Sequence, residues 1–366
     1  MDRQRFDINL VFLRSPGLLG KEFLHLDLDV KSDIIRHRFD FKGVFKLSRV
    51  LAAQKTQVLF LINHLNSLFF GVLAARLANV PVCINWENET FKKYPFHKFT
   101  MLGRWILHLG IDKVVAAAHG HETYIAEVEK IPRHKIVTIY NGVDPLKFAS
   151  PLSAMEAKQR LKVPDISPVV SIIAVLRPDK AHEVFLKAAQ IVLNQISDVH
   201  FLVLGDGPRK DHLRDLSKSL GIEKNVHFLG FQRELADILA AVDINTLSSK
   251  PEQETLSVAA IEAMSCGIPI VCTDVGFMRE IVIPDQTGYL VKVGDAHSLA
   301  ERLTYLLTHR PLLERMRKET KKLVQEKLTI QQMTSDFENL IIRTHQQNIN
   351  KLINPNEHAQ RKERCF

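Results

Sequence analysis

The sequence has few cysteines and no long apolar segment. None of its four cysteines belongs to a Cys-x-x-Cys pair, which argues against both a disulfide framework and a thiolate zinc site. No uninterrupted apolar run approaches the roughly 20 residues that a membrane-spanning helix needs. The opening stretch includes Asp7 and Asn9 and is too short and too polar for a secretory signal. We therefore expect a soluble, cytoplasmic protein of a reducing compartment.

Positive charge is concentrated in the first part of the chain. The 366 residues carry a net charge of +8, and residues 1–150 contain 21 Lys and Arg against 14 Asp and Glu, so +7 of the excess lies there. This asymmetry indicates an anionic partner, such as lipid phosphate, an acidic membrane or nucleic acid, or simply a solvated basic surface. Because nucleic acid has only the charge in its favour, we expect no nucleic-acid partner.

Short apolar runs alternate with amphipathic stretches of helix length along nearly the whole chain. This alternation is typical of βαβ units with parallel sheets. It predicts an α/β fold of two doubly wound, Rossmann-like domains at 1–148 and 149–328, then a packed helix at 329–347 and a mobile tail at 348–366. The expected strands are 8–13, 58–62, 82–85, 113–117, 136–140, 169–176, 199–204, 226–229, 244–247, 270–273 and 288–291.

Two glutamates frame a short helix in the second half. Glu254 precedes the helix and Glu262 lies within it, and the helix ends at Gly267 because Pro269 prevents its continuation. Glu262 has only small or apolar neighbours at i±3 and i±4, so no cation of its own helix pairs with it. Sugar hydroxyls would satisfy such a carboxylate. Alternatively, Glu262 pairs with a distant Lys or Arg, and Glu254 merely favours the positive end of the helix dipole.

Lys180 supplies the opposite charge. The segment Leu176-Arg177-Pro178-Asp179-Lys180 leaves a strand and opens a helix, so the ammonium lies where the helix dipole favours an anion. A diphosphate fits there, because helix N–H groups and a flexible ammonium together neutralise it without a metal. A solvated lysine in a first helical turn is the alternative.

A glycine turn and a histidine cluster carry weaker signals. Gly205 and Gly207 follow a strand in a turn that lets the backbone approach a ligand. The third glycine of the dinucleotide fingerprint is missing, which disfavours an NAD-dependent oxidoreductase. His119 and His121 lie beside Glu122, but the His-Glu-x-x-His spacing is absent, so we expect neither a metal nor a cofactor.

Taken together, these segments resemble the retaining nucleotide-sugar glycosyltransferases of family 4, which have the two-domain GT-B architecture. The resemblance is strongest over residues 113–343. It rests mainly on the Glu254/Glu262 pair with its Glu-Ala-Met-x-x-Gly-x-Pro surroundings. Residues 139–144, 176–180, 204–208, 228–230, 273–276, 280 and 287–288 support it.

The resemblance implies a role for each of these residues. Glu254 would contact hydroxyls of the donor sugar near the anomeric carbon, Glu262 would bind the ribose, and Lys180 would stabilise the diphosphate as it leaves. Phe231 would lie near the base. The donor-binding residues besides Glu262 would be Arg177, Gly205, Gly207, Phe231, Thr255, Leu256 and Ser257.

The sequence departs from the family pattern in two places. An arginine commonly precedes the lysine, but the matching position is Val175, so we expect Arg177 to take over a phosphate contact. Family members also open with a strand and a glycine-rich loop, whereas residues 8–17 resemble their second strand. We therefore expect the N-terminal domain to lack its first βα unit, with Met1 an internal start, a truncation or a sign of degeneration. Exposed strand edges and apolar surface would follow.

The acceptor side is less defined. Asn85, Trp86 and Glu87 follow a strand end, where ligands of parallel sheets bind, so we expect them to contact the acceptor. Residues 91–105 combine cations such as Lys92 and Arg104 with aromatic side chains. They would either rest on an anionic membrane surface or form a solvated helix with an apolar core face.

These inferences predict metal-independent transfer of a sugar from a nucleoside-diphosphate sugar to a glycan or lipid-linked acceptor with retention of configuration. Such a hexosyltransferase would serve polysaccharide or lipopolysaccharide biosynthesis in the cytoplasm, with a peripheral place on a membrane as an option. The alternatives are a GT-B epimerase or phosphorylase, and a non-catalytic or truncated protein that binds nucleotide sugar. The base, the sugar, the acceptor, the linkage and the oligomeric state do not follow from the sequence.

Overall fold

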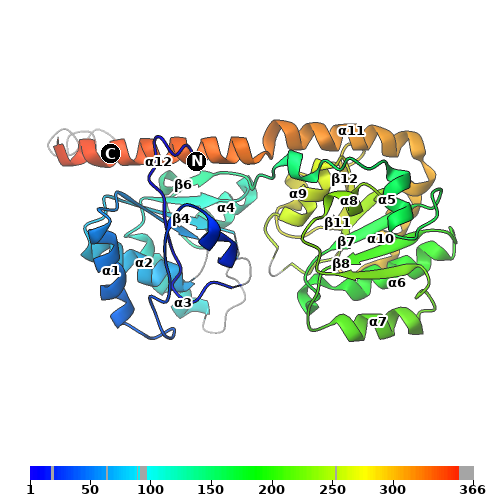
Figure 1. Cartoon of the computed structure of the whole chain (residues 1–366), viewed down its shortest axis with the longest axis horizontal. Coiled ribbons are helices and arrows are strands. Elements are labelled where there is room, and N and C mark those ends of the chain that lie inside the picture. The colour runs from blue at the N-terminus through cyan, green and yellow to red at the C-terminus, as the bar shows by residue number, and fades with distance from the viewer. Residues whose placement is uncertain (18–19, 63–64, 89, 91–96, 252–253, 354–366) are drawn as a thin grey trace. The chain divides into compact units, whose positions relative to one another are not determined.

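The computed structural model describes residues 1–353 except 18–19, 63–64, 89, 91–96 and 252–253, and the side chains at 97–100 and 351–352 also lie outside that description. The chain divides into two compact units (Figure 1). Unit 1 contains residues 1–139 and the segment from 334 onward, and unit 2 contains residues 140–333. Both units are α/β with parallel strands, which confirms the predicted fold class.

Unit 1 contains two separate parallel sheets. Strands β1 and β2 form a two-stranded sheet, and β3 to β6 form a four-stranded sheet in chain order. Its strands are β1 (Asn9–Val11), β2 (Asp29–Lys31), β3 (Val58–Ile62), β4 (Val82–Glu87), β5 (Lys113–Ala116) and β6 (Ile136–Thr138). Its helices are α1 (Lys42–Ala53), α2 (Leu65–Leu77), α3 (His97–His108), α4 (His119–Glu127) and most of α12 (Ile330–Ile353).

The four-stranded sheet carries helices on both faces (Figure 1). Leu61 of β3 points toward α2, where a Cβ added at Gly71 would lie 2.3 Å from its Cδ2. The ring of the neighbouring Phe60 packs edge-to-face on Phe337 of α12, with centroids 5.2 Å apart. Because successive side chains of a strand point to opposite faces, α2 and α12 cover opposite faces. Right-handed crossovers place α3 and α4 on the same face as α2.

Strand β3 lies at an edge of its sheet although all five of its residues are apolar. Ile62 is exposed and three of its other residues are half-buried, whereas most of β4 is buried. A wholly apolar strand is typical of the interior of a parallel sheet. Within the described residues, no strand pairs with this free edge. Apolar surface at such an edge agrees with the sequence-based expectation for this domain, while the cause that we gave for it stays a prediction.

Unit 2 has one six-stranded parallel sheet in the order β12-β11-β10-β7-β8-β9. Counted from β7, this is the doubly wound order 3-2-1-4-5-6 read from the other edge. Its strands are β7 (Val169–Ile173), β8 (His200–Leu204), β9 (Val226–Gly230), β10 (Ile244–Leu247), β11 (Ile270–Thr273) and β12 (Gly288–Val291). Its helices are α5 (Ala154–Arg160), α6 (His182–Leu193), α7 (Lys210–Ser219), α8 (Ala236–Leu239), α9 (Val258–Ser265), α10 (Ala296–Thr308) and α11 (Arg310–Lys327).

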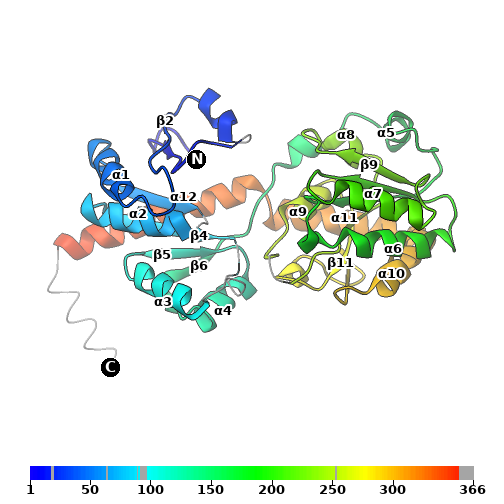
Figure 2. The same ribbon diagram turned by 90° about the horizontal axis from the view of Figure 1, so that it is seen from below.

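Helices lie on both faces of the unit 2 sheet, so the sheet separates two apolar cores (Figure 2). Phe185 and Leu186 of α6 pack with Leu303 of α10 in one core. Ile261 and Met264 of α9 lie in the other. This arrangement explains why the predicted strands of unit 2, which read as continuous apolar runs, match the observed ones closely.

The division between the units falls at residue 140 rather than at 149. The Tyr140 hydroxyl donates to Glu280, the Gly142 amide donates to Met333 Sδ at 3.2 Å, and Val143 forms a parallel bridge with Thr329. These contacts tie the start of the turn-rich seam to unit 2.

The C-terminal helix packs on unit 1 and is longer than predicted. Phe337, Leu340 and Ile341 are buried, which confirms that this helix docks. The predicted mobile tail is wrong for 348–353, because α12 continues there and Asn348 Nδ2 donates to the Pro81 carbonyl at 3.0 Å and to Asp112 at 2.8 Å. Residues 354–366 lie outside the described residues. Across the helices described, none is long and apolar enough to span a bilayer.

Candidate functional site

The centre of the unit 2 sheet is the point at which its strand order reverses. Strands β7 and β10 are neighbours there, although two strands intervene in the sequence. Ligands of doubly wound sheets bind beyond the carboxyl ends of the strands at this switch point. Lys180 follows β7 and Glu254 follows β10, so topology brings two sequence-predicted residues to the same place.

Lys180 and Glu254 form an ion pair at this switch point. Lys180 Nζ lies 2.6 Å from Glu254 Oε2, and the two side chains are 17% and 8% exposed. Each charge compensates the other, which limits the cost of removing them from water. An ammonium and a carboxylate at one strand junction are suited to a ligand that has both phosphate and hydroxyl groups.

Three backbone acceptors hold the Lys180 segment in place. Ser248 Oγ donates to the carbonyls of Lys180 and Ala181 at 2.9 and 3.1 Å, and the Lys250 amide donates to the Asp179 carbonyl at 2.8 Å. Ala181 has a φ of 46°, a left-handed conformation that non-glycine residues rarely adopt. The segment after β7 is thus fixed by the segment after β10.

The Glu254 segment is held from the other side by the turn after β11. Gly276 has a φ of 54°, and a Cβ there would lie 2.4 Å from the carbonyl oxygens of both Glu254 and Thr255. The Phe277 amide donates to the Thr255 carbonyl at 2.7 Å. Only glycine allows this approach, so the predicted motif residue Gly276 has a structural task in positioning Glu254.

Glu262 lies on α9 and has no cationic partner among the described residues. It is half-buried, and burial raises the pKa of its carboxyl. The alternative, that Glu262 pairs with a distant Lys or Arg, therefore has no support among the described residues. Glu262 makes no contact with the Lys180–Glu254 pair, and its role toward ribose stays a prediction.

The start of α9 offers unpaired amides. Ser257 caps the helix, because its Oγ accepts from the Ala260 amide at 3.3 Å. The amides of Leu256 and Ser257 donate to no acceptor within the described residues. Such N–H groups at a helix start favour an anion, which supports the diphosphate role predicted for this segment.

Arg177 is occupied within its own turn. Its Nε and Nη2 donate to the two carboxylate oxygens of Asp179 at 3.1 and 2.9 Å. Burial opposes ionisation of Asp179, but the hydrogen bonds from Arg177 hold the pKa of that carboxyl below its ordinary value. A phosphate contact by Arg177 stays a prediction.

Gly205 and Gly207 are explained by packing within the protein. A Cβ on Gly205 would lie 2.0 Å from the Ala174 carbonyl oxygen, and one on Gly207 would lie 2.7 Å from that of Leu176. The glycines thus let the segment after β8 approach the segment that leads to Lys180. Phe231 is exposed just after β9, at the same carboxyl edge of the sheet.

His182 is a residue of this region that the sequence analysis did not single out. It is buried at the start of α6, and neither ring nitrogen has a partner among the described residues. Burial lowers the pKa of His182 to about 4, so the ring is neutral near pH 7. Only its position two residues after Lys180 could have drawn attention to it.

Asn85 and Glu87 in unit 1 are buried in a cluster of charges. Glu87 accepts hydrogen bonds from Arg104 at 2.7 Å and from Asn85 at 2.8 Å. Arg104 also donates to Glu129 at 2.6 Å. Burial opposes ionisation of Glu87, but Arg104 outweighs it and lowers the pKa of Glu87 to about 2. An acceptor role for Asn85 and Glu87 stays a prediction, and the described structure gives them a packing role.

His108 and Trp86 complete this part of unit 1. His108 Nδ1 lies 2.7 Å from the Arg104 carbonyl, and its Nε2 lies 3.1 Å from Glu87. Trp86 packs edge-to-face on Phe337 of α12 at a centroid distance of 5.1 Å.

Two family profiles match the chain. Residues 1–146 match "Glycosyltransferase Family 4", and residues 154–323 match "Glycosyl transferases group 1". Together they cover most of the chain, and the second contains Lys180, Glu254 and Glu262.

Two curated relatives are enzymes that act on sugars, according to their names. The chain is 29% identical over 229 residues to N-acetyl-alpha-D-glucosaminyl L-malate synthase from Bacillus anthracis, which covers 63% of this chain and 59% of that protein. It is 26% identical over 321 residues to UDP-Gal:alpha-D-GlcNAc-diphosphoundecaprenol alpha-1,3-galactosyltransferase from Escherichia coli, which covers 83% and 80%. The chain thus spans less than two thirds of the first relative.

The fold is similar to that of a solved structure that contains UDP and glucose. HepE from Anabaena, in complex with UDP and glucose, superposes with a TM-score of 0.74 over 94% of this chain and 91% of that chain, at 21% identity. Likeness at this identity shows the fold alone. With both family profiles in chain order on two Rossmann-like units, the chain belongs to the group 1 and family 4 glycosyltransferases of the GT-B fold.

Proposed function

We propose that this protein transfers a sugar from a nucleoside-diphosphate sugar to an acceptor hydroxyl. The observation that carries the proposal is the Lys180–Glu254 ion pair at the switch point between β7 and β10. One relative named above is an N-acetyl-glucosaminyl malate synthase and the other is a galactosyltransferase. The name of the second includes UDP-Gal, a nucleotide sugar. These names support a nucleotide-sugar donor.

Each group has a defined task in the proposed reaction. Binding of the diphosphate draws Lys180 from Glu254, and the α9 amides complete the neutralisation of the leaving group. Glu254, released from the ion pair, accepts hydrogen bonds from sugar hydroxyls near the anomeric carbon. Glu262 accepts from the ribose hydroxyls, which supply the donors that the protein does not. No step requires a metal, so we expect transfer to persist in the presence of a chelator.

The stereochemistry and acceptor are finer parts of the proposal. The bond from the anomeric carbon to the diphosphate breaks through an oxocarbenium-like state. The acceptor hydroxyl attacks from the same face and passes its proton to the leaving diphosphate oxygen, so that the configuration is retained. A glycan or lipid-linked acceptor is supported by the diphosphoundecaprenol in the name of the Escherichia coli relative. NMR of the anomeric proton in the first product formed would distinguish retention from inversion.

A thermal-shift panel of UDP-, GDP- and ADP-sugars tests donor binding. Binding to the folded state raises its stability, by about 2.7 kcal/mol at a ligand concentration 100 times the Kd. We expect one nucleotide class to shift the wild type, and Glu262→Gln to reduce that shift. Glu319→Gln is the matched control, because Glu319 is an exposed glutamate of α11 in the same unit without an ion pair.

The outcomes separate this proposal from its rivals. No shift with any nucleotide sugar would contradict it. A shift without release of nucleoside diphosphate in the presence of acceptor would indicate a non-catalytic binding protein. Conversion of the donor sugar without an acceptor would indicate an epimerase, and dependence on inorganic phosphate would indicate a phosphorylase.

A further inference from the structure

Among the described side chains of α3, two charged or polar ones are buried and several large apolar ones are exposed. Arg104 and His108 are 3% and 2% exposed in the ion cluster with Glu87. The outward residues follow the i, i+3, i+4, i+7 spacing of one helix face, and a surface helix normally shows the reverse arrangement. This α3 apolar face consists of Leu102, Trp105 and Ile106 of the helix and Leu109 directly after it, which are 55%, 42%, 53% and 60% exposed.

The apolar surface continues onto α2. Gly110 follows α3, and a Cβ there would lie 2.6 Å from Val72 Cγ1 and 3.5 Å from Arg76 Nε. The end of α3 therefore lies against α2. Leu73 and Leu77 of α2 are exposed beside this contact. Protein surfaces ordinarily expose large apolar side chains singly, whereas here six are exposed on two neighbouring helices.

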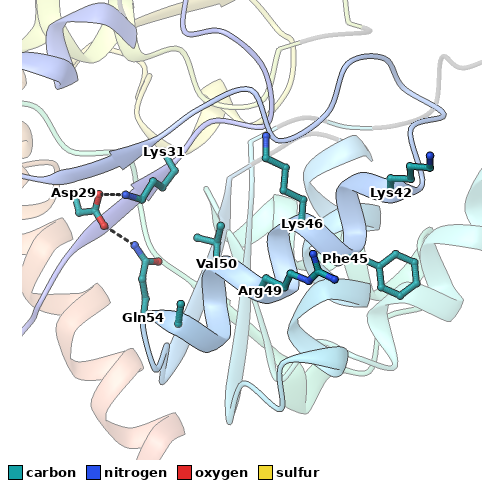
Figure 3. Close-up of a pocket in the computed structure, with 9 residues that line it drawn as sticks. Asp29, Lys31, Lys42, Phe45, Lys46, Arg49, Val50 and Gln54 are labelled. Atoms are coloured by element: carbon teal, nitrogen blue, oxygen red, sulfur yellow. Dashed lines mark hydrogen bonds and ion pairs between the residues drawn. The ribbon is translucent and has the colours of Figure 1, made fainter.

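Helix α1 adds positive charge to the same helical layer. Lys42, Lys46 and Arg49 are exposed, and they line an open pocket of about 780 Å³ together with Phe45 (Figure 3). They form the α1 basic face. Lys46 Nζ donates to the Asp33 carbonyl, and none of the three cations has a carboxylate partner among the described residues.

The one carboxylate that lines this pocket is already paired. Asp29 accepts from Lys31 at 2.9 Å and from Gln54 Nε2 at 2.9 Å, as the dashed lines of Figure 3 show. Those contacts hold the pKa of Asp29 below its ordinary value. The pocket is therefore suited to an anion.

The two faces belong to one side of unit 1. Helices α1, α2 and α3 form a layer on the sheet face opposite α12 (Figures 1 and 2). The ring of exposed Phe41, directly before α1, packs edge-to-face on Phe69 of α2 at 6.0 Å. Since Gly43, Val44 and Leu47 of α1 are buried, Phe45 and Arg49 lie on the outward side of that layer.

We propose that this outer surface of unit 1 docks on an anionic lipid bilayer. The α3 apolar face lies at the boundary of the acyl chains, and the α1 basic face binds headgroup phosphates, as in interfacial amphipathic helices. A second copy is a poorer occupant, since a two-fold interface presents the same surface to itself and supplies no anions to the cations.

This surface differs from the one suggested by sequence alone. Residues 91–96 lie outside the described residues, and the prediction that Arg104 faces a membrane is wrong, because Arg104 is buried between Glu87 and Glu129. Trp105 is exposed, and its place on a membrane stays a prediction. The inference adds a partner to the proposed function, but lipid binding does not depend on catalysis.

Sedimentation of the full chain with vesicles tests the proposal. We expect binding to phosphatidylcholine vesicles that contain phosphatidylglycerol, weaker binding to phosphatidylcholine alone, and a loss of binding as salt increases. Trp105→Ser with Ile106→Ser should lower the partition coefficient at least tenfold. Lys42→Glu with Arg49→Glu should lower it at least about 25-fold, from roughly fivefold for each charge removed.

Matched controls come from unit 2. Leu146→Ser with Ile166→Ser removes two exposed apolar side chains, and Lys224→Glu with Lys322→Glu reverses two exposed charges. These controls should bind vesicles like the wild type. All variants should keep the nucleotide-induced thermal shift of the wild type, which separates loss of docking from loss of the donor site.

Three results would overturn the docking surface. One is the absence of binding to both vesicle types at low salt. Another is an equal loss of binding in the unit 2 controls. The third is a wild-type dimer in sedimentation velocity that Trp105→Ser with Ile106→Ser dissociates, since this would assign the face to a second copy.

Discussion

Two buried groups of opposite charges, one around Glu87 in unit 1 and one at Lys180 and Glu254 in unit 2, are completed differently. In unit 1, Glu87 is bound by Arg104, His108 and Asn85, and all of these side chains are 4% exposed or less. In unit 2, Lys180 and Glu254 have only each other among the described residues, and Lys180 remains 17% exposed. Both carboxylate oxygens of Glu87 are satisfied by protein donors, whereas the Lys180–Glu254 pair leaves hydrogen-bonding capacity for a ligand.

This comparison teaches how to separate structural from functional carboxylates. Glu87 ends β4 and Glu254 follows β10, so position at a strand end alone does not distinguish these two carboxylates. The number of protein partners does, because a buried carboxylate with several donors is already satisfied. Glu262, with no cation, and Glu254, with one, are the carboxylates that still need partners.

The largest expected effect is on unit 1. Glu87→Gln leaves Arg104 and His108 without their shared anion, and breaking a buried pair in this way costs about 3–5 kcal/mol. Both tryptophans, Trp86 and Trp105, lie in unit 1, so urea unfolding followed by tryptophan fluorescence reports this unit selectively. A loss of unfolding free energy below about 1 kcal/mol would show that the Glu87 cluster contributes little to the stability of unit 1.

A smaller effect is expected in unit 2 from Gly276→Ala. The new Cβ collides with the carbonyls of Glu254 and Thr255, which should cost about 1–3 kcal/mol and displace the Glu254 carboxylate. Gly294→Ala is the matched control, because Gly294 also has a positive φ, of 77°, but nothing lies within 4 Å of its added Cβ. We expect turnover to fall in the first variant only. Equal turnover in both variants would show that the turn after β11 does not position Glu254 for catalysis.

The smallest effect for a single step in conditions is a pH dependence of unit 1, of at most about 1.4 kcal/mol for each pH unit. Burial, together with the charge of Glu87, raises the pKa of Glu129 from 4.5 to about 8. Between these values folded Glu129 holds a proton that the unfolded chain has released, so its contribution is full below pH 4.5 and is lost as the pH rises through about 8.

Urea unfolding from pH 5 to 8 measures this contribution. The unfolding free energy of unit 1 should fall with rising pH by up to about 1.4 kcal/mol per unit, and Glu129→Gln should flatten the slope. Glu127→Gln, at an exposed glutamate that ends α4 two residues earlier, is the control and should leave the slope intact. An identical slope in all three proteins would rule out Glu129 as its source.

The sequence predicted unit 2 better than unit 1. Continuous apolar runs such as Ile244–Leu247 and Ile270–Thr273 coincide with observed strands because both faces of this sheet are buried. Strand β2, Asp29–Lys31, was missed, since three residues that alternate in burial leave little pattern. The seam at 140–148 was assigned to the wrong unit, because its partners Glu280, Thr329 and Met333 are far away in sequence.

The site residues also divide into those that local sequence predicted and those that depend on tertiary packing. Lys180 and Glu254 were predicted from local charge and helix position, and topology then placed them together. The burial of Glu87 was not predictable, because its partners Arg104 and His108 lie on α3 and only tertiary packing joins that helix to β4. The packing tasks of Gly205 and Gly207 were likewise hidden, since the carbonyls that they approach follow another strand.

The central claim is that Lys180 stabilises a leaving diphosphate, and one measurement tests it most directly. Release of nucleoside diphosphate from the donor identified by thermal shift is compared among the wild type, Lys180→Ala and the exposed control Lys187→Ala of α6. Loss of a fixed charge-assisted contact of about 2.7–4 kcal/mol predicts turnover about 10²–10³ lower in Lys180→Ala and unchanged in Lys187→Ala. Wild-type turnover in a folded Lys180→Ala protein would contradict the account.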